Sequence, residues 1–248
     1  MKAELIDYMG TDLTVVNAAR VSFDKESDWE EVCMCGQEEP SMGFPCTHGG
    51  CFSETLKSLT ERDTKLIKYL SKHGHWTPFA HPQITLREKV PIFVARQRFK
   101  HMVGFTYNEV SRRYVDSKPE FYMPDVWRKK ADNVKQGSSD EEVDIHIYHG
   151  TNGKNGCEYP YGDSVEIALE TYEHMLKCGV CPEQARMVLP QSMYTEYWVT
   201  GSLAAWARAY KQRIDPHSQK EIQDLAKQWD TIIRPLFPVS WEALTWTE

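Results

Sequence analysis

The sequence lacks the features that direct a chain into or across a membrane. No apolar run approaches the roughly 20 residues that span a bilayer. The first residues, MKAELIDYMG, do not contain the apolar core of a signal peptide. Hydrophobic residues make up 41% of the chain and charged residues 26%, which is the profile of a soluble globular protein. We therefore expect a cytoplasmic protein without a membrane partner.

A positive charge excess and a disulfide framework are also missing. The net charge of −7 at pH 7 argues against a broad basic face, so no nucleic-acid partner is expected. The seven cysteines are an odd number without a secretory signal, which predicts free thiols. We predict no metal site, although zinc is the open alternative for one segment whose first ligand spacing is unusually tight. Its candidate ligands are Cys33, Cys35, Cys46, His48 and Cys51.

What the sequence does contain is a series of helical patterns with recognisable ends. Strands are expected at residues 4–8 and 84–88, where short alternating patterns occur. Helices are expected to begin at Asp12 and Asp215, because an aspartate can cap free backbone amides. Further helices are predicted over residues 60–72, 92–99, 163–179, 182–189 and 200–213. Few strands and many helices indicate a mixed α and β class.

The densest cluster of polar side chains lies between residues 96 and 114. Arginine forks bind phosphate through two hydrogen bonds, and a serine hydroxyl supplies a further donor. The preceding residues 91–95 are apolar enough to be buried, so the charged residues follow a core element. This arrangement favours a ligand site over a solvated charged face. The cluster comprises Arg96, Gln97, Arg98, Lys100, His101, Asn108, Glu109, Ser111, Arg112 and Arg113.

Two further clusters each allow two interpretations. The segment HGHWTPFAH, residues 73–81, contains three histidines that suit either a metal or stacking on a planar cofactor. The metal is the weaker interpretation, because no acidic or cysteine ligand lies nearby at regular spacing. The other cluster contains Arg186, Arg208, Arg213 and His217. It is either an anion site close to a helix start or a set of surface ion pairs.

Four segments occur in a fixed order along the chain. They are HGHWTPFAH, PIFVARQRFKH…NEVSRRY, ARMVLPQSMYTEYW and RIDPHSQKEIQ. Each segment alone is weakly specific, but the four in order with compatible gaps are strongly specific. In these segments the chain resembles the flavin-dependent thymidylate synthases, over roughly residues 3–24, 60–125 and 163–240.

The resemblance implies a fold and an assembly. The fold is α+β, with a small antiparallel sheet flanked by long helices. We expect a single domain of residues 1–248, with irregular insertions at about 24–58 and 129–162. The resemblance also implies a homotetramer whose active sites are shared between subunits.

The resemblance further implies a reaction in which dUMP becomes dTMP. Methylenetetrahydrofolate supplies the carbon, and FAD that has been reduced by NADPH supplies the hydride. A fixed guanidinium beside the uracil ring would stabilise the charge that develops there. Two alternatives share the nucleotide site: a related flavin-dependent dUMP hydroxymethylase, and a degenerate relative that binds nucleotide without catalysis.

Roles for individual residues follow from the same resemblance. Arg213 matches the arginine that polarises the uracil ring. Substrate contacts match Gln97, Lys100, Glu109, Val110, Ser111, Arg112, Arg113 and Arg186. Cofactor contacts match His75, Thr77, Lys100, His101, Met102, Val103, Asn108, Glu109, Ser202, Arg208 and His217.

The chain departs from the family's pattern at several flavin-side positions. Lys100 and Met102 replace two signature arginines, so one position loses the planar fork and the other loses the charge as well. We hypothesise that Arg98 compensates from one turn earlier. Ser202 begins a segment that replaces an Asn-x-Arg pair, and Arg208 is expected to restore a charge nearby. The arginines on the substrate side are intact.

Overall fold

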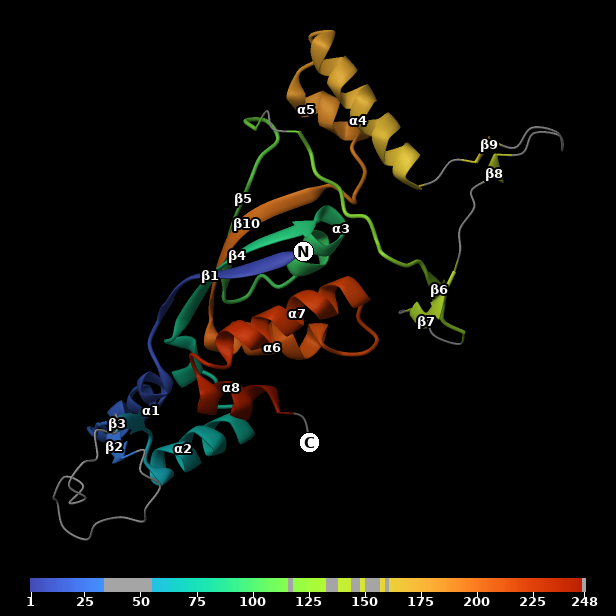
Figure 1. The fold of residues 1–248 in the computed structure, drawn as a ribbon. Helices are drawn as coiled ribbons and strands as arrows, with labels where there is room; N and C mark the ends of the chain where they lie inside the picture. The colour runs from blue at the N-terminus through green and yellow to red at the C-terminus, as the bar shows by residue number, and fades with distance from the viewer. Residues whose placement is uncertain are drawn as a thin grey trace, which may run out of the picture.

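The centre of the protein is a small antiparallel sheet, seen in a computed structural model (Figure 1). The structure describes residues 1–33, 55–115, 118–132, 138–143, 148–149, 157–158 and 161–246. The sheet has four strands in the order β1-β4-β10-β5. Their bounds are β1 Lys2–Met9, β4 Gln83–Pro91, β10 Tyr194–Ser202 and β5 Phe105–Glu109. The predicted α+β class with a small antiparallel sheet is confirmed.

Helices cover one face of this sheet and extend beyond both of its ends. Figure 1 shows α6 and α7 lying side by side beneath the strands, with α8 and α2 farther from them. The longer helices are α1 Asp12–Arg20, α2 Glu61–Lys72, α4 Tyr161–Lys177, α6 Leu203–Arg213, α7 Lys220–Ile233 and α8 Pro238–Thr245. The shorter ones are α3 Ile92–Arg98, α5 Pro182–Ala185, η1 Val21–Phe23, η2 Pro78–Ala80 and η3 Arg186–Val188. No helix in the described part of the chain is long and apolar enough to cross a membrane.

Three short antiparallel strand pairs lie within or beside the two predicted insertions. They pair β2 Glu30–Cys33 with β3 Thr55–Ser58, β6 Arg128–Lys130 with β7 Ser138–Glu142, and β8 Tyr148–His149 with β9 Cys157–Glu158. The second stretch was predicted to be a loop throughout, and its described parts correct this. Strand pairing here depends on partners that local hydrophobic periodicity does not reveal.

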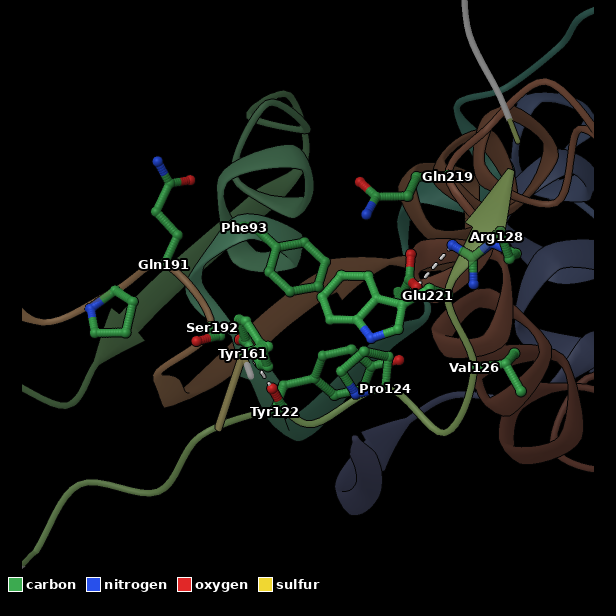
Figure 2. Close-up of a pocket in the computed structure, with 12 residues that line it drawn as sticks. Phe93, Tyr122, Pro124, Val126, Arg128, Tyr161, Gln191, Ser192, Gln219 and Glu221 are labelled. Carbon is green, nitrogen blue, oxygen red and sulfur yellow. Dashed lines mark hydrogen bonds and ion pairs between the residues drawn. The ribbon is translucent and has the colours of Figure 1, made fainter. Parts of the chain in front are cut away.

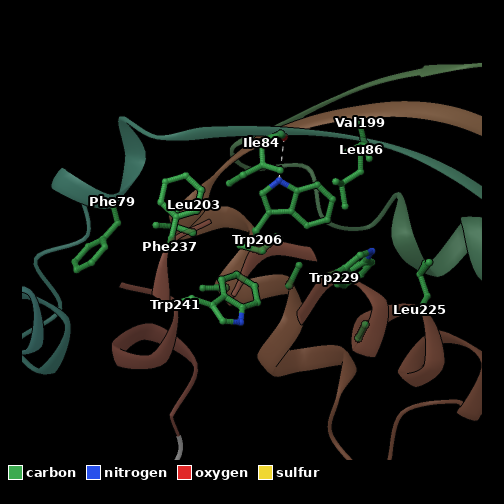
Figure 3. Packing of buried hydrophobic residues seen from close by; sticks show 14 of the residues in the cluster. Phe79, Ile84, Leu86, Val199, Leu203, Trp206, Leu225, Trp229, Phe237 and Trp241 are labelled. Carbon is green, nitrogen blue, oxygen red and sulfur yellow. Dashed lines mark hydrogen bonds between the residues drawn. The ribbon is translucent and has the colours of Figure 1, made fainter. Parts of the chain in front are cut away.

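The core forms between the sheet and the helices α6, α7 and α8 (Figure 3). Alternate residues of β4 point into it, and Ile84 and Leu86 are fully buried. The helices contribute the indoles of Trp206, Trp229 and Trp241, which are also fully buried. Such large aromatic side chains remove extensive apolar surface from water. This packing fixes α6, which carries several candidate site residues, against the sheet.

The predicted helix over residues 200–213 is wrong at its beginning. Residues 194–202 form β10, the strand between β4 and β5, and α6 starts only at Leu203. Tyr197 and Val199 face the core while Trp198 faces away, which is the alternation of a strand. β10 and β5 were both missed, because their neighbours in the sheet are distant in sequence.

The two predicted aspartate caps need correction as well. Thr11 is the N-cap of α1, and the Asp12 carboxylate instead accepts the backbone N–H groups of Val239 and Ser240, each at 2.9 Å. Asp12 therefore caps α8, far along the chain. Asp215 accepts the backbone N–H of His217 at 2.8 Å within a turn, and α7 begins later, at Lys220. Both carboxylates do bind free amides, but not those of the helices predicted.

Candidate functional site

Arg213 and His101 form the first group of candidate site residues. Arg213 is in the last turn of α6, and His101 follows the end of α3. The Nε of Arg213 donates to Nε2 of His101 at 2.8 Å, and its Nη2 donates to the backbone oxygen of Gln97 at 3.0 Å. The side chain of Gln97 in turn donates to Oε1 of Gln219 at 2.5 Å. The end of α3 and the turn after it thus hold the half-buried guanidinium of α6 in a fixed orientation, although the two helices are far apart in sequence.

His101 is the neutral partner in this group. Burial, followed by the charges of Arg213, Arg98 and Arg208, lowers the pKa of His101 from 6.5 to about 4. The ring is therefore uncharged at neutral pH, and its Nε2 has a lone pair that can accept the Arg213 hydrogen bond. Burial and the nearby charge of Arg98 also lower the pKa of Arg213 from its usual value. The pair keeps its single positive charge on the arginine.

Replacing His101 with glutamine is expected to remove a pH dependence of stability. Between pH 6.5 and about 4 the unfolded chain binds the histidine proton and the folded chain does not. The free energy of unfolding therefore falls as the pH falls through this window. One pKa unit corresponds to about 1.4 kcal/mol, so the loss between pH 7 and pH 5 is about 2 kcal/mol.

Urea unfolding of the wild type and of His101→Gln at pH 7 and pH 5 measures this contribution. Glutamine retains an oxygen that can accept from Arg213, and the other histidines are common to both proteins. The free energy of unfolding of the wild type should fall by about 2 kcal/mol more than that of the variant between the two pH values. Equal losses in the two proteins would contradict the assignment of a low pKa to His101.

Arg98 lies in the core, which corrects the hypothesis that it compensates for the missing signature arginines. Its side chain is 0% exposed, and its Nε lies 3.3 Å from Oε2 of the equally buried Glu88. Its guanidinium carbon lies 4.4 Å from the centre of the Phe105 ring and 4.7 Å from that of the Trp206 ring. Arg98 therefore cannot reach a ligand at the surface, and it stabilises the fold from inside.

Tyr107 links this buried pair to the His101 turn. Its hydroxyl accepts from Nη1 of Arg98 at 2.6 Å and donates to the backbone oxygen of His101 at 2.7 Å. Burial raises the pKa of Tyr107 to about 12, so the phenol keeps its proton. The alternating pattern of β4 places Glu88 on the buried face, but sequence reasoning missed the role of Tyr107.

The turn after His101 runs along α6 and exposes apolar side chains. Met102 is 69% exposed and Val103 is 74% exposed, and Lys100 is exposed beside them. The guanidinium of Arg208 donates to the backbone oxygen of Val103. Gly104 has a φ of 79°, and a Cβ there would lie 2.8 Å from that of Ala205, so the turn requires glycine. The turn therefore combines exposed apolar surface with two cationic side chains.

A second group forms at the other end of β5. Oγ of Ser111 accepts from Nε of Arg113 at 3.2 Å, and Nη1 of Arg113 lies 3.6 Å from a carboxylate oxygen of Glu183. Nε of Arg186 donates to the backbone oxygen of Glu183 at 3.4 Å. Two exposed arginines and a serine hydroxyl thus converge, a donor set suited to a phosphate. Sequence reasoning missed Glu183, which no motif marks.

β5 lies between the two groups in the sequence, after His101 and before Ser111. At about 3.4 Å per residue its ends, Phe105 and Glu109, lie about 14 Å apart. Glu109 is held by Thr195, whose hydroxyl donates to Oε1 at 2.6 Å. Next to it, the backbone N–H of Val110 donates to the backbone oxygen of Glu196 at 2.9 Å. Asn108 pairs with Trp198 across the strands.

The remaining predicted flavin contacts are His75, Thr77, Ser202 and His217. His75 and Thr77 are exposed in the turn before η2, and the His75 ring stacks on Tyr69 with centres 6.3 Å apart. Ser202 is the N-cap of α6, because its hydroxyl accepts the N–H of Ala205 at 3.3 Å. His217 is exposed and lies 3.0 Å from the Asp215 carboxylate. Arg112, a predicted substrate contact, is half-buried beside Ser111.

The prediction of free thiols is tested in part. The described residues contain no group of three or more His, Cys, Asp or Glu that could hold a metal ion. Cys178 and Cys181 are exposed free thiols, as predicted. The side chains of the alternative zinc site lie outside the described residues; they are those of Cys33, Cys35, Cys46, His48 and Cys51.

Comparison with known proteins gives consistent matches. The family described as thymidylate synthase complementing protein matches residues 4–239. A flavin-dependent thymidylate synthase of Thermosipho africanus is 35% identical over 96% of this chain and 88% of the relative. One from Thermus thermophilus is 33% identical over 96% of this chain and 73% of the relative. A solved UMP/dUMP methylase, PolB from Streptomyces cacaoi with bound 5-Br dUMP, has a TM-score of 0.70 at 27% identity and covers 98% and 94% of the two chains.

Proposed function

The chain belongs to the thymidylate synthase complementing protein family, the flavin-dependent thymidylate synthases, and from this premise we propose that it converts dUMP to dTMP. The proposed carbon donor is methylenetetrahydrofolate, and the proposed hydride source is FAD reduced by NADPH. The observation that carries this proposal is the Arg213 guanidinium, which neutral His101 and the Gln97 carbonyl hold in place. It matches the position that polarises uracil in the family.

Arg213 supports the chemistry by stabilising negative charge on the pyrimidine. Two of its N–H groups are used by His101 and Gln97, and an arginine has five, so further donors are available for a carbonyl oxygen. Because the guanidinium is already oriented and partly buried, it needs little reorganisation when charge develops on the ring. The described residues of the two groups do not include a cysteine, and the proposed activation of the uracil ring is polarisation by Arg213.

The second group supports a nucleoside monophosphate as substrate. Arg113 and Arg186 present two guanidinium groups, and Ser111 adds a hydroxyl. The phosphate would displace the weak Arg113–Glu183 pair, whose separation of 3.6 Å and exposed partners mean that little stability is lost. We propose that Gln97, Lys100, Glu109, Val110 and Arg112 also contact the substrate.

The turn after His101 fits the flavin. Exposed Met102 and Val103 offer apolar surface to a flat ring, while Lys100 and Arg208 offer positive charge to a pyrophosphate. FAD would supply hydride transfer when bound. The residues proposed to hold it also include His75, Thr77, His101, Asn108, Glu109, Ser202 and His217.

We further propose a homotetramer and a cytoplasmic location. The sheet face opposite α6 and α7 supports assembly, because Trp198 is 51% exposed there, beside the Arg87–Glu196 ion pair. Active sites shared between subunits would explain why His75 and Thr77 lie apart from Arg213. We also propose that the chain forms a single domain, with insertions at about 24–58 and 129–162.

Replacing Arg113 with alanine tests the phosphate assignment. A hydrogen bond to a charged group is worth about 1.5–3 kcal/mol, so dUMP should bind about 10- to 100-fold more weakly. Deoxyuridine, which lacks the phosphate, should bind the variant and the wild type equally. Isothermal titration calorimetry with both ligands measures the difference.

The matched control is Arg62→Ala, which removes an exposed arginine from α2. This variant should bind dUMP as the wild type does. A similar loss of deoxyuridine and dUMP binding in Arg113→Ala would contradict the phosphate role, because the substitution would then act on the nucleoside.

A further inference from the structure

A cavity of about 530 Å³ lies beside the Arg213 group, and we call it the aromatic pocket. It opens between the start of α3, the segment 122–128, the start of α4, residues 190–192 and the start of α7. Figure 2 shows Phe93, Tyr122 and Tyr161 on one side and Glu221 with Arg128 on the other. A cavity of this volume is in the range that holds a small organic ligand.

Four aromatic rings contribute to the wall. The rings of Phe93 and Tyr122 pack edge to face with centres 5.7 Å apart, and those of Trp127 and Tyr161 do so at 5.1 Å. The Tyr161 hydroxyl donates to the backbone oxygen of Tyr122 at 3.2 Å and so connects the two pairs. Rings fixed in this way offer faces and edges to another flat ring.

The wall carries two polar atoms to which a ligand could hydrogen-bond. Ser192 is 7% exposed and Glu221 is 5% exposed, and both line the pocket. Among the residues that the structure describes, Oγ of Ser192 and Oε2 of Glu221 make no hydrogen bond. A buried polar group without a partner is costly, and where its residue lines a cavity a ligand atom can supply the missing hydrogen bond. Oε2 of Glu221 requires a donor, whereas the Ser192 hydroxyl can donate or accept.

The charges of the wall favour an uncharged ligand over an anionic one. The other oxygen of Glu221 accepts from Nη2 of Arg128 at 2.8 Å, so the Arg128 guanidinium that lines the pocket is already neutralised. A phosphate would face the Glu221 carboxylate and would be repelled. A flat heterocycle with an N–H donor next to an acceptor would satisfy both Glu221 and Ser192 and stack on the rings.

We propose that the aromatic pocket binds a planar heteroaromatic ring. The ring would use an amide-like edge, whose N–H donates to the Glu221 carboxylate and whose oxygen or nitrogen acceptor accepts from the Ser192 hydroxyl. This inference rests on the proposed function, which offers two sources of such an edge. One is the pteridine of the carbon donor, and the other is the nicotinamide of the reductant.

The position of the pocket suits a ligand that takes part in the reaction. Gln219 lines the pocket and accepts from the side chain of Gln97 at 2.5 Å. The backbone oxygen of the same Gln97 accepts from Arg213 at 3.0 Å. The pocket therefore borders the residues that hold the proposed uracil-polarising arginine.

The test is calorimetric binding of folic acid and of NADP⁺ to the flavin-loaded protein without dUMP, so that no turnover occurs. Ser192→Ala should weaken the binding of one of the two probes about tenfold, which corresponds to the loss of one hydrogen bond. The melting temperature should stay the same or rise, because the variant removes a hydroxyl that has no partner in the described part of the fold. Glu221→Gln should weaken the same probe at least as much, since it replaces an acceptor oxygen with a donor.

Asp224→Asn is the matched control, because it removes the same charge from an exposed position one turn along α7. It should leave both probes unaffected. Weaker binding of folic acid alone identifies the pteridine as the ligand of the pocket. Weaker binding of NADP⁺ alone identifies the nicotinamide. The proposal is overturned if neither probe binds the wild type, or if both bind Ser192→Ala and Glu221→Gln as they bind the wild type. A separate assay of dTMP formation by the wild type shows whether the proposed function itself fails.

Discussion

Replacing Arg213 with alanine is expected to lower kcat for dTMP formation by about 10²- to 10³-fold, the usual cost of removing one oriented donor from a site where charge develops. The side chain is half-buried and fixed at two points, by His101 at 2.8 Å and by the Gln97 carbonyl at 3.0 Å. No water molecule can reproduce a permanent positive charge held in that orientation. The loss should therefore appear mainly in kcat, with a smaller change in the affinity for dUMP.

Flavin binding is the control for the Arg213 result. The cofactor residues that we propose near this end of α6 include Lys100, Met102 and Arg208, and the substitution leaves them in place. Visible absorbance of the purified variant should therefore show that most of its flavin is retained. Arg234→Ala, which removes an exposed arginine from the end of α7, should keep full activity. Loss of flavin together with activity would reassign Arg213 to the cofactor site.

The largest expected effect on stability comes from Arg98→Met. This change removes one partner of a fully buried ion pair and leaves Glu88 with its charge in the core. Breaking a buried pair in this way typically costs about 3–5 kcal/mol. Glu88 would keep hydrogen bonds from the Tyr197 hydroxyl at 2.5 Å and the Trp229 indole at 2.7 Å, but these donors are neutral.

A double variant separates the charge from the packing. Arg98 packs against the rings of Phe105 and Trp206, and methionine fills much of the same space. Adding Glu88→Gln removes the uncompensated charge, so the double variant should recover part of the lost free energy of unfolding. Urea unfolding of both proteins measures this. A single variant within about 1 kcal/mol of the wild type would contradict the buried pair as a source of stability.

Much of the fold can be predicted from local patterns. β4 alternates between core and solvent, and the buried side chains of Ile84 and Leu86 follow that pattern. α2 begins after Thr60, whose hydroxyl accepts the N–H of Asp63 at 3.0 Å, and it ends before Gly74. Such elements are specified within a short window of sequence.

The errors arise where distant contacts decide the structure. β10 exists because β4 and β5 lie on either side of it, and the Gly201 that interrupts its pattern lies against Phe105. Asp12 caps a helix that lies 227 positions away along the chain, at Val239. Burial of Arg98 could not be inferred from its charged neighbours, since only the fold brings Glu88 and four aromatic rings around it.

The candidate site shows the same division. Its residues were found through four short segments that resemble a family, whereas their geometry was not predictable. Arg213 and His101 are 112 positions apart, and only the packing of α6 beside the end of α3 brings them together. The neutral state of His101 then follows from burial and from three nearby arginines.

The measurement that tests the central claim most directly is the mass of the nucleotide product. The protein is incubated with dUMP, methylenetetrahydrofolate, FAD and NADPH, and the nucleotides are analysed by mass spectrometry. The proposed function predicts a product heavier than dUMP by one methylene unit, which is dTMP, and at least about 100-fold slower formation of it by Arg213→Ala. A hydroxymethyl nucleotide, or dUMP recovered unchanged while it still binds the protein, would contradict the claim that this chain is a thymidylate synthase.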